Sequence, residues 1–416
     1  MQPVSGSFIA LLIVVTIGCL ALTVWTWGWQ RLRFVRRMAT LGTTQLMVVL
    51  CVVAAINASQ NFFVTWDDIL EGGVAADPGA APVVALPNDP QGLRATAGSA
   101  RYSQLGPAVA AAERAHRIKP RGGVMVSTVI RGSRTGYRLP SRLYFPAAYF
   151  DAGKANHEFP VVEFFTGYYG GLDIFQRTLG ANNELDKLIE SGKMPPVIVV
   201  IPEQNPNLPT DSECVNAVRG DQAETYVGLD VPDVVKSDLR VSKDRRDWAL
   251  MGYSTGGFCA ANIAIHHSEL FSMVISLSGY FHPVTDSSTG DTYHGDKKAK
   301  LANNPTQTIA LPRRFPLSFY LATSTGDGEG MRGLKEFGPK IHAPDRLIKA
   351  VGGHTGHNFT TWKRAIPGAF TWLGKELISP PPMLVNPTAQ PNPTPDPAAS
   401  TRPPKGASAT KVKRKH

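Results

Sequence analysis

Two long apolar runs without a single charge open the chain, at residues 8–29 and 42–64. The first has about the ~20 residues that an α-helix needs to cross a bilayer, and it ends in three tryptophans, Trp25, Trp27 and Trp29, which are typical of a membrane interface. No Lys or Arg precedes it, which disfavours a cleaved signal peptide. The second run ends in polar residues, which can face another helix. The pattern predicts a membrane anchor over 1–70 with two transmembrane helices.

The charges between the two runs predict the orientation of this anchor. All four lie on arginines, at positions 31, 33, 36 and 37, and basic loops stay in the cytoplasm. With two spans, everything after residue 66 then lies outside the cytoplasm. With the first span alone, the same rule would place the large domain inside. We predict a multi-pass protein of the cell membrane with an extracytoplasmic domain.

Two further segments lack the hydrophobic periodicity of a helix or a strand. Residues 71–104 are rich in Gly, Ala and Pro and are predicted to form a flexible linker. Residues 380–416 hold ten of the 33 prolines and end in KVKRKH, which predicts a disordered basic tail. Such a tail either solubilises the chain or adheres to an anionic envelope polymer. Most of the net charge of +10 lies in the two ends of the chain, so no nucleic-acid partner is expected.

Residues 105–379 have the pattern of a folded domain. Short apolar runs alternate with segments long enough for helices, which is typical of a mostly parallel sheet covered on both faces. The first two runs, split by turn residues, predict an antiparallel pair. The predicted strands are Val124–Ile130, Tyr137–Phe145, Pro160–Phe165, Pro196–Ile201, Trp248–Met251, Met273–Leu277, Leu317–Ala322 and Arg346–Val351.

A candidate nucleophile follows the fifth of these runs. Gly252-Tyr253-Ser254-Thr255-Gly256 leads directly into a segment with helical spacing of apolar residues. Strand, G-x-S-x-G turn and helix together form a nucleophile elbow, in which side chains at the two glycines would collide with the neighbouring elements. Ser254 is therefore the predicted nucleophile, and the N–H of Thr255 is a predicted oxyanion donor. The plainer reading is an ordinary strand–helix turn.

A serine nucleophile needs a general base and an acid that orients it. In hydrolases of this type the acid and then the histidine follow the serine along the chain. His354 and His357 both follow the last predicted strand, and their spacing does not choose between them. Asp327 is the first carboxylate after Leu317–Ala322 and is the predicted acid, with Glu329 as the alternative.

A second oxyanion donor is expected on a loop after an early strand. Thr166-Gly167-Tyr168 follows Pro160–Phe165, and the N–H of Tyr168 is the candidate. The plain alternative is a flexible glycine-rich loop. Residues 282–315 lie between a strand and the acid loop, where they are expected to cover the site.

The four cysteines divide into two groups. Cys19 and Cys51 lie in the predicted spans, whereas Cys214 and Cys259 lie in the folded domain. Disulfides form outside the cytoplasm, so a Cys214–Cys259 bridge is predicted, against two buried thiols.

Three stretches resemble one family: VVEFFTGYYGG, ALMGYSTGGFCAANIAIHHSELFSMVISLSGYF and GGHTGHNFTTWKRAIPGAFTWL. They look like the putative-esterase family of α/β-hydrolases, which includes mycolyltransferases and S-formylglutathione hydrolases, over roughly residues 120–378. The resemblance implies an α/β-hydrolase fold for 105–379. The family's G-H-x-W-x-x-W falls on Gly356 to Trp362, which favours His357 as the base, with Phe359 where the family usually has Trp. The mycolyltransferases' Asp-Gly-Leu appears here as Thr166-Gly167-Tyr168.

These features predict a membrane-anchored serine esterase or acyltransferase at the cell envelope. An acyl-enzyme on Ser254 would pass its acyl group to water or to a carbohydrate hydroxyl. The chain has neither an H-E-x-x-H nor a G-x-x-x-x-G-K-[ST] motif, and no cofactor or metal is expected. The alternative is a non-catalytic binding module with a hydrolase fold, tethered to the membrane.

Overall fold

The computed structural model describes residues 1–29, 32–60, 63, 66, 69, 103–168, 170–381 and 385. The predicted linker at 71–104 and the predicted tail at 380–416 therefore lie almost wholly outside the described residues.

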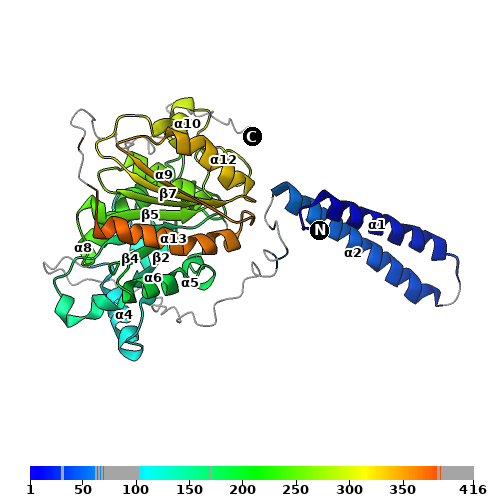
Figure 1. Cartoon of the computed structure of the whole chain (residues 1–416), viewed down its shortest axis with the longest axis horizontal. Coiled ribbons are helices and arrows are strands. Elements are labelled where there is room, and N and C mark those ends of the chain that lie inside the picture. The colour runs from blue at the N-terminus through cyan, green and yellow to red at the C-terminus, as the bar shows by residue number, and fades with distance from the viewer. Residues whose placement is uncertain are drawn as a thin grey trace, which may run out of the picture.

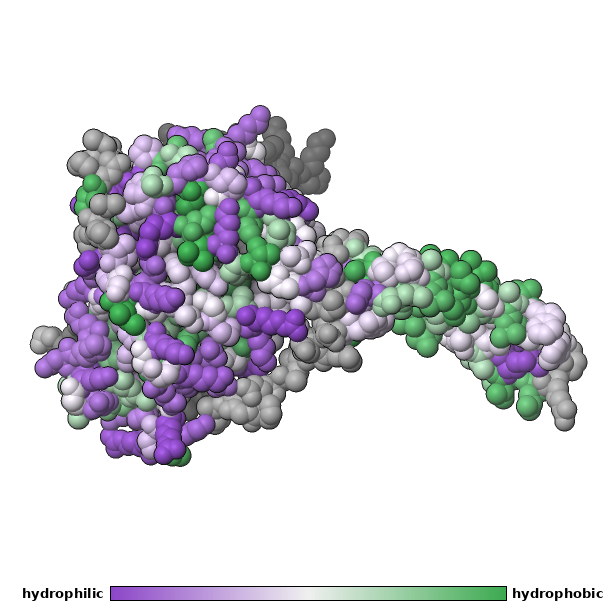
Figure 2. All heavy atoms as spheres, viewed as in Figure 1, coloured by the Kyte–Doolittle hydropathy of each residue, from purple (hydrophilic) through white to green (hydrophobic). Residues whose placement is uncertain are grey.

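Two antiparallel helices, α1 (Gly6–Thr26) and α2 (Arg33–Gln60), form the N-terminal part (Figure 1). They meet through small polar side chains: Oγ1 of Thr23 lies 3.2 Å from Oγ1 of Thr44, and Oγ1 of Thr16 lies 3.2 Å from Sγ of Cys51. Both are long and apolar enough to cross a membrane, and much of their apolar surface is exposed (Figure 2). The second helix begins earlier than the predicted 42–64, because residues 33–41 hold no Gly or Pro to stop it.

An eight-stranded sheet forms the centre of the folded domain, in the order β1-β2-β4-β3-β5-β6-β7-β8. The pairs β1–β2 and β2–β4 are antiparallel, and all other neighbours are parallel. The strands are β1 (Val124–Arg131), β2 (Arg138–Phe145), β3 (Val161–Phe165), β4 (Ile198–Pro202), β5 (Trp248–Tyr253), β6 (Met273–Leu277), β7 (Ser318–Ser324) and β8 (Arg346–Gly352).

Helices cover both faces of this sheet and bury two apolar cores (Figure 1). One face packs against α5 (Ile174–Arg177), α6 (Ala181–Glu190) and α13 (Phe359–Ile378). The other packs against α4 (Gly106–Ile118), α8 (Val231–Asp238), α9 (Thr255–His266) and α12 (Gly328–Phe337). Shorter helices are α7 (Ala223–Thr225), α10 (Lys297–Ala302) and α11 (Pro305–Thr308), with 3₁₀ turns at Ala147–Phe150, Ala152–Lys154, Arg245–Asp247 and Gly338–Lys340.

The predicted α/β-hydrolase architecture is confirmed. Each predicted strand is present, and the first two pair in antiparallel fashion. The ends differ by one or two residues. The most consequential difference is that β5 continues to Tyr253, so that the strand leads directly into Ser254.

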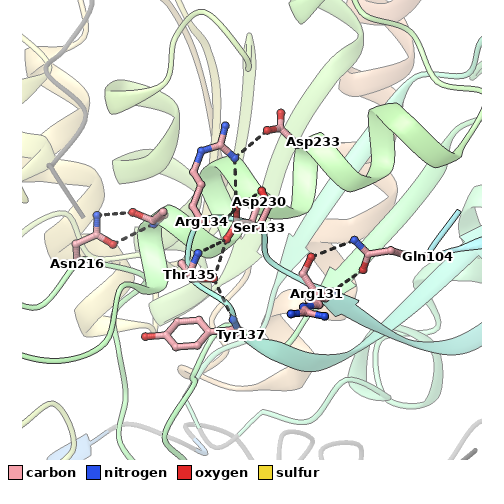
Figure 3. A network of polar contacts seen from close by, with 10 residues as sticks. Gln104, Arg131, Ser133, Arg134, Thr135, Tyr137, Asn216, Asp230 and Asp233 are labelled. Atoms are coloured by element: carbon pink, nitrogen blue, oxygen red, sulfur yellow. Dashed lines mark hydrogen bonds and ion pairs between the residues drawn. The ribbon is translucent and has the colours of Figure 1, made fainter. Parts of the chain in front are cut away.

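A buried carboxylate ties the β1–β2 hairpin to the rest of the domain (Figure 3). Asp230 ends a π-helical turn, Tyr226–Asp230, just before α8. It accepts hydrogen bonds from the N–H groups of Arg134 and Thr135, at 2.9 and 3.0 Å, and from the Thr135 hydroxyl at 2.7 Å. The Arg134 guanidinium bridges Asp230 and Asp233. This network anchors the antiparallel edge of the sheet to the layer that contains α8 and α9.

Candidate active site

Ser254 stands on a sharp turn between β5 and α9. Its backbone lies at φ 53°, ψ −123°, a conformation that non-glycine residues rarely adopt. A Cβ on Gly252 would lie 2.2 Å from the carbonyl oxygen of Gly256, and one on Gly256 would lie 2.2 Å from that of Phe165. Only glycines therefore permit this turn, and strained backbone of this kind clusters at functional sites.

His357 lies on the loop between β8 and α13, in hydrogen-bond contact with the serine. Its Nε2 is 2.9 Å from Oγ of Ser254. The ring is buried and packs edge-on against Trp362, with 5.2 Å between ring centroids. His354, the other histidine that the sequence proposes, is exposed, and its Nδ1 lies 3.4 Å from the hydroxyl of Thr325.

Asp327 contacts the ring nitrogen of His357 that does not face Ser254. Its Oδ1 is 3.0 Å from Nδ1 of His357. The carboxylate is fully buried and caps α12 by accepting the N–H of Gly330 at 2.9 Å. Glu329 lies two residues further on, in the first turn of α12, and is half exposed, with Oε2 3.6 Å from Nε2 of His357. The two carboxylates thus flank different nitrogens of the same ring.

The hydrogen bond between Asp327 and His357 shifts both pKa values. Burial alone would raise the pKa of Asp327, but the hydrogen bond to His357, its charge and the N–H of Gly330 hold it below its ordinary value. Burial alone would lower the pKa of His357, but the hydrogen bond and charge of Asp327, with the charge of Glu329, raise it. Asp327 is therefore ionised at neutral pH, where it can orient the imidazole and stabilise an imidazolium.

The two candidate oxyanion donors lie on segments that adjoin Ser254. Thr255 is the first residue of α9, where N–H groups lack intrahelical acceptors. Tyr168 belongs to the loop after β3, directly beyond Gly167. A Cβ on Gly167 would lie 3.1 Å from Cβ of Ser254, so this loop runs against the nucleophile.

A disulfide joins Cys214 to Cys259, with 5.4 Å between the Cα atoms. Cys259 lies in the second turn of α9, so the bridge ties the loop after β4 to the helix that carries the nucleophile at its start. Residues 282–315 pack against this loop as well, because Ser288 and Thr292 accept backbone hydrogen bonds from Asp211 and Val218.

Replacing both Cys214 and Cys259 by serine is expected to lower the free energy of unfolding by about 4 kcal/mol, because the bridge closes 45 residues of chain. Urea denaturation of the full chain in detergent measures the loss, with the Cys19→Ser/Cys51→Ser variant as the control. The unfolded wild type should show two free thiols before reduction and four after it. Four thiols before reduction would contradict the bridge.

The model of the family described as "Putative esterase" matches residues 132–373, which is more than half of the chain. The chain belongs to the putative esterase family. The matched region holds Ser254, His357 and Asp327, and the family's description names ester hydrolysis.

The relatives of this chain are distant in sequence. An uncharacterized protein of Corynebacterium glutamicum is 26% identical over 242 residues, which are 56% of this chain and 56% of that protein. The chain thus aligns with only about half the length of that relative. A ferulic acid esterase structure shares 17% identity at a TM-score of 0.54, covering 62% of this chain and 99% of that one. The S-formylglutathione hydrolase of Agrobacterium tumefaciens shares 18% at 0.52, covering 62% and 96%. These structures show that the fold is shared.

The sequence analysis missed one part of the candidate site. A polar loop follows β4, and its buried side chains Gln204 and Asp211 reach the two segments on which the candidate oxyanion donors lie. The available signal was the polar run Glu203-Gln204-Asn205 directly after a fully buried strand. Polar residues at the carboxyl ends of parallel strands are common at functional sites.

Proposed function

We propose that the chain is a membrane-anchored serine esterase that acts on carboxylic esters through an acyl-enzyme intermediate. The observation that carries the proposal is the continuous hydrogen-bonded line from Asp327 through His357 to Ser254. A non-catalytic binding module would have no need of a strained serine aligned with a buried His–Asp pair.

The proposed reaction has two halves. Oγ of Ser254 attacks the ester carbonyl carbon while Nε2 of His357 takes the hydroxyl proton. The N–H groups of Thr255 and Tyr168 stabilise the oxyanion, a contribution of about 10²–10³ in rate for one such donor. His357 returns the proton to the departing alcohol, which leaves the acyl group on Ser254. Water, activated by the same histidine, then releases the acid. A carbohydrate hydroxyl in place of water would make the reaction an acyl transfer.

Fluorophosphonate labelling of the full chain tests this function. We expect one phosphonyl group per chain, placed on Ser254 by peptide mass mapping, and no labelling of Ser254→Ala. Ser318→Ala is the matched control, because Ser318 is another buried serine but begins a different strand, β7. A folded wild type that takes up no label would contradict the proposal in favour of the binding module.

The pH profile of kcat/KM should report the raised pKa of His357. The histidine acts as a base only when neutral, and a raised pKa keeps it protonated to higher pH. We therefore expect activity to fall on acidification already above pH 6.5, the ordinary histidine value. Glu329→Gln removes one charge that raises this pKa, so it should move the acid limb to lower pH. An acid limb below pH 6.5, or one that His354→Ala shifts as much, would contradict the assignment.

We also propose that α1 and α2 span a membrane and hold the catalytic domain outside the cytoplasm. The turn between them carries the features of a membrane interface. Arg37 donates to the carbonyl oxygen of Trp27 at 2.8 Å, and its guanidinium stacks 4.5 Å from the Trp27 ring. Arg36 lies 5.8 Å from the ring of Trp29. The basic residues at this turn favour its placement in the cytoplasm.

Reporter fusions test the orientation. Alkaline phosphatase, which needs an oxidising compartment, should be active when fused after residue 71 and inactive when fused after residue 31. A fluorescent protein that folds only in the cytoplasm should give the opposite pattern. Cytoplasmic fluorescence from the fusion after residue 71 would contradict two spans.

A further inference from the structure

The amide of Gln204 is bonded to the backbone of the loop that leads to Tyr168. The parallel register of β3 and β4 ends at Glu163 and Val200, so it gives Thr166, the residue that follows β3, no backbone partner on β4. Gln204, which is 1% exposed, supplies one: its Oε1 accepts the N–H of Thr166 at 3.0 Å, and its Nε2 donates to the Thr166 carbonyl at 2.9 Å. The amide of one side chain thus makes both backbone hydrogen bonds that a neighbouring strand would otherwise make to Thr166.

A second hydrogen bond joins the segment that follows β4 to the loop that contains Tyr168. Two residues beyond Thr166, the hydroxyl of Tyr168 donates to the carbonyl oxygen of Pro209. Residues 204–214, called the brace from here on, therefore hold the loop both before and at the residue whose N–H is the proposed donor.

The other end of the brace is bonded to the helix that starts at Thr255. Oδ2 of Asp211 accepts a hydrogen bond from the Thr255 hydroxyl at 3.1 Å, and Cys214 is joined to Cys259. Glu213 and Cys214 have left-handed backbone, at φ 48° and 51°. Such strain persists only where the surroundings fix it, and here Glu213 accepts hydrogen bonds from the Tyr280 hydroxyl and the N–H of Val284.

Bonds within the brace connect its two ends. The hydroxyl of Ser212 donates to the backbone oxygen of Gln204 at 2.8 Å, and Oδ1 of Asn205 accepts the N–H of Ser212 at 2.9 Å. The N–H of Cys214 in turn donates to Oγ of Ser212 at 3.1 Å. A continuous set of bonds therefore runs from Thr166 to α9 without passing through Ser254.

We propose that the brace fixes the spacing between the N–H groups of Tyr168 and Thr255, and that Gln204 is the positioning residue of the oxyanion hole. This inference rests on the proposed function. Oxyanion donors act because they are held in place before charge develops, and a displacement of about 1 Å can cost about 10²-fold in rate. The brace acts on the transition state and leaves the ground-state ester contacts alone.

Steady-state hydrolysis of a p-nitrophenyl ester by the full chain in detergent tests the inference. Gln204→Met keeps the side-chain length and removes both bonds to Thr166. We expect kcat to fall about 10- to 100-fold while KM changes less than about threefold, since lost transition-state contacts lower kcat and leave KM. The inhibition constant of a trifluoromethyl ketone, which places an oxyanion in the same hole, should rise by the same factor as kcat falls.

Asn262→Leu is the matched control. It also removes a buried amide, one that lies on α9 and donates to Oδ1 of Asn303 at 2.9 Å, so it reports the cost of a lost buried hydrogen bond without touching the brace. Thr255→Val is a second test variant, which keeps the side-chain shape but removes the hydrogen bond from Thr255 to Asp211 at the other end of the brace. It should also lower kcat with little change in KM.

The outcomes separate the two claims. Wild type without hydrolysis that depends on Ser254 overturns the proposed function, and the inference with it. If the wild type is active, but Gln204→Met and Thr255→Val are no slower than Asn262→Leu, the proposed role of the brace is overturned and the proposed function stands. A selective loss of kcat in both brace variants, matched by weaker ketone binding, supports it.

Discussion

Alanine at Ser254 or at His357 is expected to lower kcat for ester hydrolysis by about 10⁴- to 10⁶-fold. The two side chains act as a unit, because the proton that leaves Oγ of Ser254 passes to Nε2 of His357, 2.9 Å away. The double variant should therefore be no slower than the slower single variant, since residues that act as a unit are not additive.

His354→Ala is the control for that experiment, because His354 sits three residues earlier on the same loop but lies exposed against Thr325. It should retain kcat within about twofold, as exposed substitutions away from the reacting atoms have small effects. A loss at His354 equal to the loss at His357 would contradict the assignment of the base. So would additive losses in the double variant.

Asparagine at Asp327 is expected to cost about 10⁴-fold in kcat with little change in KM. The amide can still occupy the buried position beside Nδ1 of His357. It can, however, donate to that nitrogen, which favours the wrong tautomer, and it no longer offsets the charge of the imidazolium that forms during attack. The folded state should survive, because asparagine also caps helices and can accept the N–H of Gly330.

Glu329→Gln tests which carboxylate, Asp327 or Glu329, orients His357, a choice that the sequence alone left open. Glu329 is half exposed and 3.6 Å from Nε2, the nitrogen that faces Ser254, so it cannot hold the proton on Nδ1. We expect kcat at neutral pH within about threefold of wild type, since a screened and exposed charge has little effect. Steady-state kinetics of both variants at one pH decide the matter, and a larger loss in Glu329→Gln than in Asp327→Asn would reverse the two roles.

The sequence predicted the fold well because a buried parallel strand requires an uninterrupted apolar run, and such runs are visible one by one. It was less precise where an element ends in polar residues. The helix α2 starts at Arg33 because arginines are good helix formers, although they do not belong in a bilayer.

Within the site, local patterns located Ser254, because the glycines of its turn are demanded by neighbouring backbone. The choice of the acid depends on which side chain a turn directs inward, and that is a tertiary property. Asp327 is the N-cap of α12, and Glu329 is already in the helix. The sequence favoured Asp327 as the first carboxylate after a predicted strand, and the preference of N-caps for aspartate agrees with that choice. Gln204 left only a general signal, a polar run after a buried strand, because its partner Thr166 lies 38 residues away.

The bridge between Cys214 and Cys259 has a consequence for how the protein is made. A chain anchored as we propose is synthesised in a reducing compartment, where this bond does not persist. Its α9 then leaves the ribosome without the covalent link to the loop after β4. The link closes only after export, when the sulfur atoms meet an oxidising environment. The domain would then reach its full stability only at its destination.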